Sequence, residues 1–206
     1  MIRDQLLSGQ QLPLKVAVTG GIGSGKSFVV HLLAEKGIKV YDCDAAAKRL
    51  MNTSKRLRRQ LCHLIGPQAY VDGKLNKAAV AQFIMSSEEN LQKVNDVVHP
   101  AVGDDFIRSG LSWMECAILF ESGFQRYVDL VACVSAPIDL RLERIMQRDG
   151  ISREKALEWM GKQLPQEVVI AQSDFEIVND GRDLHPQINQ LLTLLTSYST
   201  NKQFIK

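Results

Sequence analysis

The chain has 206 residues, of which 45% are hydrophobic and 23% are charged, and its formal net charge is +2. This length and composition are typical of one globular domain with a sizeable core, and they exclude an intrinsically disordered chain. The small net charge excludes a general nucleic-acid binder, so we predict that the partners are small molecules and not nucleic acid.

The chain begins with a polar, aperiodic stretch, residues 1–13, that we predict to be a flexible N-terminal extension. Residues 14–206 alternate short apolar runs with longer helical patterns, which is typical of a single α/β domain. We expect the second predicted strand to lie beside the first in a parallel sheet. Five runs predict strands buried on both faces: KVAVT (15–19), IKVYD (38–42), MECAILF (114–120), LVACVSA (130–136) and FEIVN (175–179).

A glycine-rich segment joins the first predicted strand to a helix. Residues 20–27, GGIGSGKS, match GxxxxGK[ST], the pattern of a phosphate-binding loop. The strand ends at Thr19 and the helix begins at Lys26, so backbone N–H groups and the helix dipole favour the same anion. This context disfavours a glycine-rich turn that only caps a helix.

The loop predicts specific contacts with a nucleoside triphosphate. We expect Lys26 to reach the β- and γ-phosphates, Ser27 to ligate Mg²⁺, and backbone N–H groups from Gly23 to Phe28 to wrap the phosphate chain. The predicted nucleotide-binding residues of the loop are Gly21, Ile22, Gly23, Ser24, Gly25, Lys26, Ser27 and Phe28.

Two aspartates follow the second predicted strand. Asp42 and Asp44 share strand parity at the carboxyl end of that strand, the edge where ligands bind in such sheets. A carboxylate there can accept a proton from an attacking hydroxyl or help to organise Mg²⁺, and Asp44 is the better candidate for the base. By itself Asp44 is equally well interpreted as the cap of the helix AAAKRLM, and the neighbouring loop favours the catalytic interpretation.

Helical patterns fill the stretches between the later strands. Residues 45–112 exceed what a crossover needs and contain the predicted helices KRLRRQLCHLI and NKAAVAQFIM. In LRLERIMQRDG, Arg144 and Arg148 share one helical face and are candidates for phosphate contacts at the edge of a lid. For Arg141 we favour a solvated position that pairs with Glu143 and Asp149. Near the C-terminus, INQLLTLL predicts a helix that docks on the sheet.

Together these motifs resemble the dephospho-coenzyme A kinases. That family has a phosphate loop written TGGIGSGKS, an aspartate pair after the second strand, an HP dipeptide and a QRDG lid. This chain has them, in the family's order and approximate spacing, at residues 19–27, Asp42 and Asp44, residues 99–100 and residues 147–150. LFESG (119–123), Gln163 and VNDG (178–181) agree further, and the likeness extends over residues 16–192.

The resemblance implies a fold, a reaction and roles for residues. It implies a P-loop NTPase-like, five-stranded parallel sheet flanked by helices, with a helical acceptor-binding insertion at about 52–112 and a helical lid at about 144–172. The implied reaction transfers the γ-phosphate of ATP, with Mg²⁺, to the ribose 3′-hydroxyl of dephospho-coenzyme A. The implied roles are the base for Asp44, phosphate closure for Arg144 and Arg148, adenine contacts for Asn179 and Gly181, and acceptor binding for His99 and Glu121.

Several alternatives stay open at the level of the sequence. His99 is equally well interpreted as a helix-terminal structural residue, and Glu121 as a buried partner of an arginine. A rival function is another small-molecule P-loop kinase that acts on a nucleoside or nucleotide. A GTPase-type switch lacks its guanine-reading NKxD segment here.

This chain also departs from the family pattern at several positions. Phe28 replaces the usual Thr, and Lys48 and Gly103 each stand where Arg is common. Val168 and Val169 replace lid charges, so we expect that some phosphate contacts shift to Lys162 or Arg153. None of these departures removes a predicted catalytic group.

Cysteine spacing and apolar runs indicate the compartment. The four cysteines, Cys43, Cys62, Cys116 and Cys133, stand far apart without a CxxC pair, which favours reduced thiols. No apolar run reaches the length of a membrane span, and no N-terminal stretch has the pattern of a signal peptide. We therefore predict a cytoplasmic protein with no membrane partner, and we separately expect a monomer.

Overall fold

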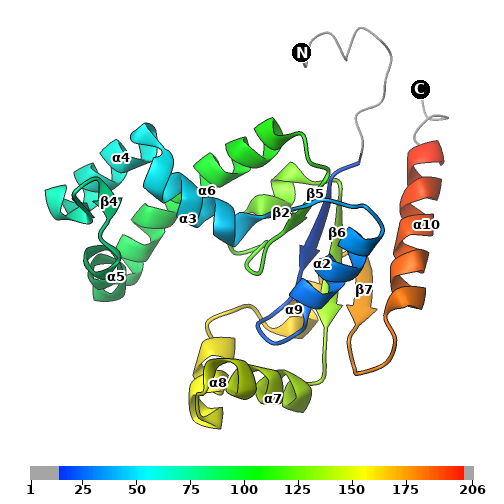
Figure 1. Cartoon of the computed structure of the whole chain (residues 1–206). Coiled ribbons are helices and arrows are strands. Elements are labelled where there is room, and N and C mark those ends of the chain that lie inside the picture. The colour runs from blue at the N-terminus through cyan, green and yellow to red at the C-terminus, as the bar shows by residue number, and fades with distance from the viewer. Residues whose placement is uncertain (1–13, 202–206) are drawn as a thin grey trace, which may run out of the picture.

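A central sheet of five parallel strands organises the molecule. A computed structural model describes residues 14–201, so the predicted extension at 1–13 lies outside the described residues. The strands run in the spatial order β2-β5-β1-β6-β7, with helices on both faces (Figure 1). This confirms the predicted α/β fold with a five-stranded parallel sheet. The strands are β1 (Val16–Thr19), β2 (Val40–Asp42), β5 (Trp113–Glu115), β6 (Leu130–Ser135) and β7 (Phe175–Val178).

The position of β2 differs from the prediction. Strand β5 lies between β1 and β2, since Trp113 is in register with Val16 on one side and with Val40 on the other. The expectation that the second strand lies beside the first was therefore wrong. All four residues of β1 are buried, whereas only the middle residue of β2 is, which suits β1 to the centre of the sheet and β2 to its edge.

Strand β5 is also shorter than predicted. It ends at Glu115, and the rest of the apolar run MECAILF turns away from the sheet. Cys116 and Leu119 nevertheless remain buried, and the turn is closed by the Ser122 N–H, which donates to the Ile118 carbonyl (2.9 Å). The apolar character of this run reflects burial in the core and not an extended backbone.

Alternating strand residues pack against two different helical layers. Val16 and Val18 of β1 pack with α2 (Lys26–Glu35) and α10 (His185–Asn201), which confirms the predicted C-terminal docking helix. Ala17 of β1 faces the other layer, where Phe106 of α6 (Glu88–Ser109) is fully buried. Successive side chains of a strand point to opposite faces of the sheet, so both faces of β1 are covered by helices.

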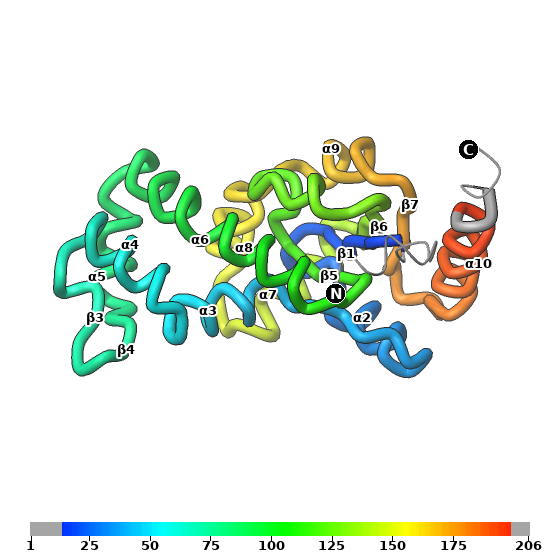
Figure 2. The backbone as a smooth tube through the Cα atoms, turned by 90° about the horizontal axis from the view of Figure 1, so that it is seen from above, coloured from blue at the N-terminus to red at the C-terminus, as the bar shows by residue number. Residues whose placement is uncertain are grey.

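The segment between β2 and β5 forms a helical extension at one end of the molecule, with α10 at the other end (Figure 2). The two predicted helices of this segment are confirmed as α4 and α5. Asp72 and Gly73, both with positive φ (49° and 81°), form the turn of a short hairpin that the sequence analysis did not predict. The elements are α3 (Cys43–Thr53), α4 (Lys55–Ile65), η1 (Pro67–Ala69), β3 (Tyr70–Val71), β4 (Lys74–Leu75), α5 (Lys77–Ser86) and α6 (Glu88–Ser109).

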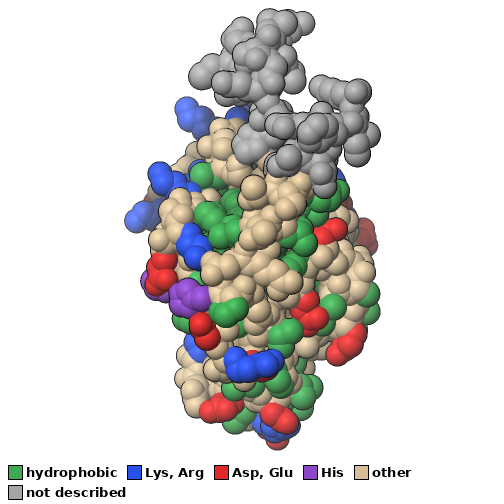
Figure 3. All heavy atoms as spheres, turned by 90° about the vertical axis from the view of Figure 1, so that its right-hand side faces the viewer, with side chains coloured by type: hydrophobic (Ala, Val, Ile, Leu, Met, Phe, Trp, Pro, Cys, Tyr) green, Lys and Arg blue, Asp and Glu red, His purple; other side chains and the backbone are tan. Residues whose placement is uncertain are grey.

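A second group of helices lies near the carboxyl ends of the strands. It contains α7 (Ile138–Asp149), α8 (Arg153–Met160) and α9 (Gln166–Ala171), and a short η2 (Phe124–Tyr127) precedes β6. Leu142, Ile145 and Ala156 form a small core between α7 and α8. On the face that carries α10, side chains of both charges are interspersed (Figure 3). Within residues 14–201, no helix has the length and apolar character of a membrane span.

Candidate active site

The glycines of the loop between β1 and α2 allow other elements to pack against it. Helix α2 begins at Lys26, as predicted, and Gly25 before it has a φ of 94°. A Cβ at Gly25 would lie 2.1 Å from Asn179 Nδ2, and one at Gly23 would lie 2.6 Å from the Arg141 carbonyl oxygen. Because glycine has no side chain at these two positions, α7 and the residue that follows β7 pack directly against the loop.

The loop presents a set of unengaged N–H groups. No acceptor among residues 14–201 bonds the N–H groups of Gly23, Gly25, Lys26 and Ser27. Such converging donors at a helix N-terminus are suited to phosphate oxygens. Three other loop N–H groups have acceptors: Ile22 donates to Gln163 Oε1 (2.7 Å), Ser24 to Gly21 O (3.2 Å) and Phe28 to Gly25 O (3.0 Å).

Lys26 is buried under the loop with its ammonium group held in place. Its Nζ donates to the carbonyls of Gly20 (2.8 Å) and Gly21 (3.2 Å), and the residue is 9% exposed. Burial lowers the pKa of Lys26, while the carboxylates of Glu115 and Asp44 act against that shift. Both of these hydrogen-bond acceptors are neutral carbonyls, so an anion bound in the loop would give the Lys26 ammonium group an ion-pair partner.

The structure separates the roles of the two aspartates after β2. Asp42 is the N-cap of α3, and its Oδ1 accepts from the Ala45 N–H (2.8 Å). Helix α3 begins at Cys43, so Asp44 lies in its first turn and not on a strand. The expectation that Asp42 and Asp44 share strand parity was therefore wrong. The interpretation of Asp44 as the helix cap is also wrong. Its carboxylate is left without a capping role at the edge of a cavity.

Glu115 is a carboxylate that the sequence analysis missed. It ends β5 directly opposite Asp42, and burial raises its pKa, with the charge of Lys26 acting against that rise. The signal in the sequence was hidden because Glu115 stands inside an apolar run and because β5 was not expected beside β2. Three carboxylates, those of Asp42, Asp44 and Glu115, therefore lie along one cavity.

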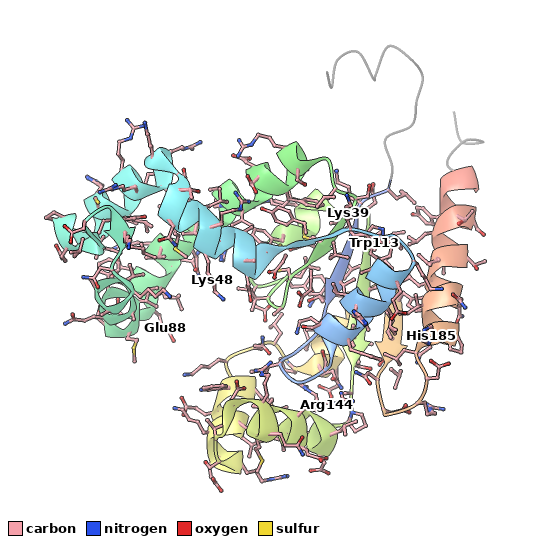
Figure 4. All side chains as sticks on the ribbon, viewed as in Figure 1. Lys39, Lys48, Glu88, Trp113, Arg144 and His185 are labelled. Atoms are coloured by element: carbon pink, nitrogen blue, oxygen red, sulfur yellow. The ribbon has the colours of Figure 1, made fainter. Side chains whose placement is uncertain are left out.

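Two large cavities meet at this edge of the sheet. The phosphate cavity, of about 690 Å³, is bordered by the loop, by Glu115 and by Arg144 and Arg148. The apolar cavity, of about 520 Å³, lies beside it in the helical extension. Asp44 and Lys48 line both cavities. Figure 4 shows Lys48 on the side of α3 that faces α7, the helix that carries Arg144.

The apolar cavity is formed by α3, α5, α6 and the segment after β5. Val80, Ile84 and Val98 form part of its walls, with His99 as a polar group. His99 lies in the middle of α6, so its interpretation as a helix-terminal residue was wrong. Its ring packs edge-on against Phe124 (5.4 Å between centroids), and burial lowers the pKa of His99, which keeps the imidazole neutral at neutral pH.

Glu121 does not line the apolar cavity. Its side chain is exposed, and Oε1 accepts from the Leu164 N–H (3.0 Å), which ties it to the segment before α9. The interpretation of Glu121 as a buried partner of an arginine was therefore wrong. Gln163, next to Leu164, contacts the phosphate loop through Ile22, so the same segment joins both sides of the site.

Arg141 corrects one expectation about α7. We favoured a solvated position, but Arg141 is 7% exposed. Its Nε donates to the Ile22 carbonyl (3.0 Å) and Nη1 to Gln166 Oε1 (3.4 Å). The loop glycines let α7 approach closely enough to bury this guanidinium, which then supports the loop from behind.

The other two arginines of α7 border the phosphate cavity. Arg144 Nη1 donates to the Gly23 carbonyl (3.3 Å) and Nη2 to Asn179 Oδ1 (3.1 Å). Arg148 is exposed and pairs with Asp149, with 2.7 Å between Nη2 and Oδ2. The predicted pair therefore lies at one cavity, with Arg144 fixed to the loop and Arg148 free to exchange its partner.

A third, smaller opening, the side cavity, lies on the other flank of the loop. Asn179, Gly181 and Phe28 line it, and Gly25 and Arg144 border both it and the phosphate cavity. Asn179 is buried, and its Nδ2 donates to the Ser24 carbonyl (2.9 Å). The side cavity and the phosphate cavity therefore lie on either side of Gly25 and Arg144.

The departure at Gly103 has a structural reason. A Cβ at Gly103 would lie 2.2 Å from Tyr127 Cζ, so the ring of Tyr127 occupies the space that a side chain there would need. In α9, Val169 is buried and Val168 is exposed. Lys162 pairs with Glu158, Arg153 pairs with Asp139, and neither lines the phosphate cavity, so phosphate contacts from these two residues stay a prediction.

Comparison with known proteins identifies relatives over most of the chain. The family model for dephospho-CoA kinase matches residues 14–185. The dephospho-CoA kinase of Bacteroides fragilis is 38% identical over 192 residues, covering 89% of this chain and 94% of that protein. The dephospho-CoA kinase of Chlorobaculum tepidum is 38% identical over 203 residues, covering 90% and 97%.

Solved structures agree with this similarity. The crystal structure of TT1252 from Thermus thermophilus has a TM-score of 0.78 at 33% identity, covering 90% of this chain and 99% of that one. A shikimate kinase from Acinetobacter baumannii, with a TM-score of 0.54 at 14% identity, covers 90% of this chain and 94% of its own, and it shares the fold alone.

Proposed function

The chain belongs to the dephospho-CoA kinase family, and we propose on this basis that its two adjoining cavities bring ATP and dephospho-coenzyme A together for phosphoryl transfer. The γ-phosphoryl group of ATP passes to the ribose 3′-hydroxyl, which yields coenzyme A and ADP in the last step of coenzyme A biosynthesis. The observation that carries the proposal is that Asp44 and Lys48 line both cavities. The acceptor hydroxyl and the γ-phosphate therefore meet beside Asp44.

Asp44 acts as the general base. Its carboxylate accepts the proton of the 3′-hydroxyl as the oxygen attacks the γ-phosphorus, and the leaving group is ADP. Asp42 is less suited to this role because its carboxylate already caps α3. A positioned general base contributes a factor of about 10² to 10⁴ to the rate.

Cationic side chains stabilise the charge of the transferring group. Lys26 exchanges the carbonyls of Gly20 and Gly21 for the β- and γ-phosphates, and the free N–H groups of the loop bind the phosphate chain. Arg144 and Arg148 act from α7 as the lid, residues 144–172, closes. Closure excludes water, so that the ribose hydroxyl receives the phosphoryl group.

The residues around Lys26 also suit Mg²⁺. Ser27 and the carboxylates of Asp42, Asp44 and Glu115 place hard oxygen donors around the phosphate cavity, and Mg²⁺ prefers such donors. Within residues 14–201 no three side chains of His, Cys, Asp or Glu are arranged to hold a metal by themselves. That agrees with an ion that takes most of its ligands from ATP phosphates and water, with Ser27 as its protein ligand. When bound, the ion supplies charge neutralisation to the β- and γ-phosphates.

The acceptor occupies the insertion, residues 52–112. The apolar walls of its cavity bury the non-reacting part of dephospho-coenzyme A, while His99 offers a neutral imidazole for a hydrogen bond. Glu121 contributes from the acceptor side by holding the backbone of Leu164, a residue of the lid. Asn179 and Gly181 lie on the adenine side of ATP, in the side cavity.

The proposal is tested by offering several acceptors to the protein with MgATP. Dephospho-coenzyme A, adenosine and AMP are supplied separately, and mass spectrometry identifies the phosphorylated product, with Lys26→Ala as the blank. Conversion of dephospho-coenzyme A to coenzyme A is the expected result. Phosphorylation of adenosine or AMP instead would favour the rival small-molecule kinase and overturn the proposed acceptor.

The same proposal extends to the state and compartment of the enzyme. Every residue assigned above comes from a single chain, so a monomer is sufficient for activity. The four cysteines are free thiols, which suits the reducing cytoplasm where ATP is available.

A further inference from the structure

Phe28 presents an aromatic ring to solvent directly after the phosphate loop. It is 52% exposed, whereas its neighbours in α2, Val29, Leu32 and Leu33, are buried in the core. The ring lines the side cavity, a space of about 510 Å³ whose walls also include Asn179, Gly181 and Arg182. An exposed aromatic residue at the wall of a cavity is more consistent with ligand contact than with core packing.

The direction of a bound nucleotide follows from the two cavities that border the loop. If the γ-phosphate lies beside Lys26 and Asp44, as the proposed function requires, the triphosphate follows the loop N–H groups away from them. Gly25 and Arg144 border both the phosphate cavity and the side cavity. The base of the nucleotide therefore enters the side cavity, next to Phe28.

The other groups in the side cavity leave base recognition largely to stacking. The Asn179 amide is committed on both sides, through Nδ2 to the Ser24 carbonyl and through Oδ1 to Arg144. Arg182 is held in a fork by Asp180, with Nε at 3.0 Å from Oδ1 and 2.9 Å from Oδ2. This pairing orients a second flat, π-bearing group at the wall of the same cavity.

We propose that the Phe28 side chain is a specificity-determining contact that stacks on the purine base of the nucleotide, with the Arg182 guanidinium as a second planar surface. The sequence analysis assigned only the backbone N–H of Phe28 to the ligand, and that N–H donates to Gly25 instead. The inference rests on the proposed function for the direction of the nucleotide. It adds a side-chain role at this position and a preference for the larger surface of a purine over a pyrimidine.

Binding measurements separate stacking from phosphate contact. Isothermal titration calorimetry with Mg²⁺ gives the Kd of ATP and of inorganic tripolyphosphate, which lacks the base, for the wild type, Phe28→Leu and Phe28→Tyr. A base–aromatic stack predicts that Phe28→Leu weakens ATP binding about 10-fold and leaves tripolyphosphate binding unchanged. Phe28→Tyr retains the ring and should restore ATP binding. Tyr198→Leu is the matched control, an exposed aromatic residue near the far end of α10.

Two results would overturn the inference. Equal loss of ATP and tripolyphosphate in Phe28→Leu would mean that the residue only shapes the loop, and loss of neither would mean that the base lies elsewhere. Nucleotide selection gives a second readout, since the ratio of ATP to CTP affinity should fall in Phe28→Leu. These measurements need no acceptor, so they remain decisive even if dephospho-coenzyme A is not phosphorylated, which would count against the proposed function alone.

Discussion

The two sides of the site are built in different ways. The phosphate loop is a contiguous stretch of eight residues, held by polar contacts from Arg141, Arg144 and Asn179. The apolar cavity is lined by residues spread from Cys43 to Phe124, and packing between helices forms it. Polar contacts with fixed geometry make one side intolerant of single changes, whereas many weak contacts make the other side respond gradually.

Among changes confined to one side of the site, Lys26→Met should produce the largest effect, and that effect should be on the nucleotide side. Removing a buried cation from the β- and γ-phosphates should lower kcat/KM for ATP by about 10²- to 10³-fold, as loss of one preorganised electrostatic contact does. Steady-state kinetics with both substrates measures it. Lys36→Met, at the exposed end of the same helix, is the control. If both variants kept wild-type activity, the phosphate side would not depend on this ammonium group.

Arg141→Met tests whether the loop needs support from behind. The change removes the donors to Ile22 and Gln166, which should cost about 1–3 kcal/mol of unfolding free energy and weaken ATP binding. Urea denaturation and calorimetric binding measure the two effects. Arg59→Met, on the exposed face of α4, should change neither. An unaltered stability of Arg141→Met would contradict the structural role given to this residue.

Ile84→Asn should affect the acceptor side alone, and more mildly. A polar group in the wall of the apolar cavity should raise the KM for dephospho-coenzyme A about 10-fold, because it costs roughly 1–3 kcal/mol to bury without a partner. The KM for ATP should stay the same. Met85→Asn is the matched control, since the next residue is 85% exposed and lies outside the cavity. If Ile84→Asn and Met85→Asn changed the KM for dephospho-coenzyme A equally, the apolar cavity would not be the acceptor side of the site.

Ser24→Ala should have the smallest effect, although it changes the loop itself. The Ser24 hydroxyl is fully buried and has no hydrogen-bond partner among residues 14–201, so its removal should change the unfolding free energy by less than about 1 kcal/mol. Ser27→Ala, at the exposed hydroxyl proposed to bind Mg²⁺, should instead lower activity strongly. Thermal denaturation and kinetics compare the two serines. A large loss in Ser24→Ala would indicate that its hydroxyl contacts the ligand.

The sequence predicted the nucleotide side better than the acceptor side for a physical reason. A phosphate loop requires particular residues at fixed spacing, so its position and the start of α2 were predictable. Arg141 was not, because its burial depends on how closely α7 approaches Gly21 and Gly23. Glu115 and the apolar walls depend on strand order and helix packing, which no local pattern encodes. The resemblance to a family supplied what periodicity alone did not, namely the acceptor and its insertion.

Gly103 illustrates how a departure from a pattern is resolved only in three dimensions. The glycine accommodates the ring of Tyr127, which is 24 residues later in the chain, and the sequence alone does not pair the two. The same holds for Asp42 and Asp44, which look equivalent in the sequence. Their roles diverge because α3 begins between them.

The central claim is that Asp44 activates the acceptor where the two cavities meet, and single-turnover kinetics of Asp44→Asn tests it most directly. Rapid quench with ATP and dephospho-coenzyme A measures the transfer step, and calorimetry measures the Kd of each substrate. The account predicts that transfer slows by about 10²- to 10⁴-fold while both Kd values stay close to those of the wild type. Transfer at the wild-type rate in Asp44→Asn would contradict it.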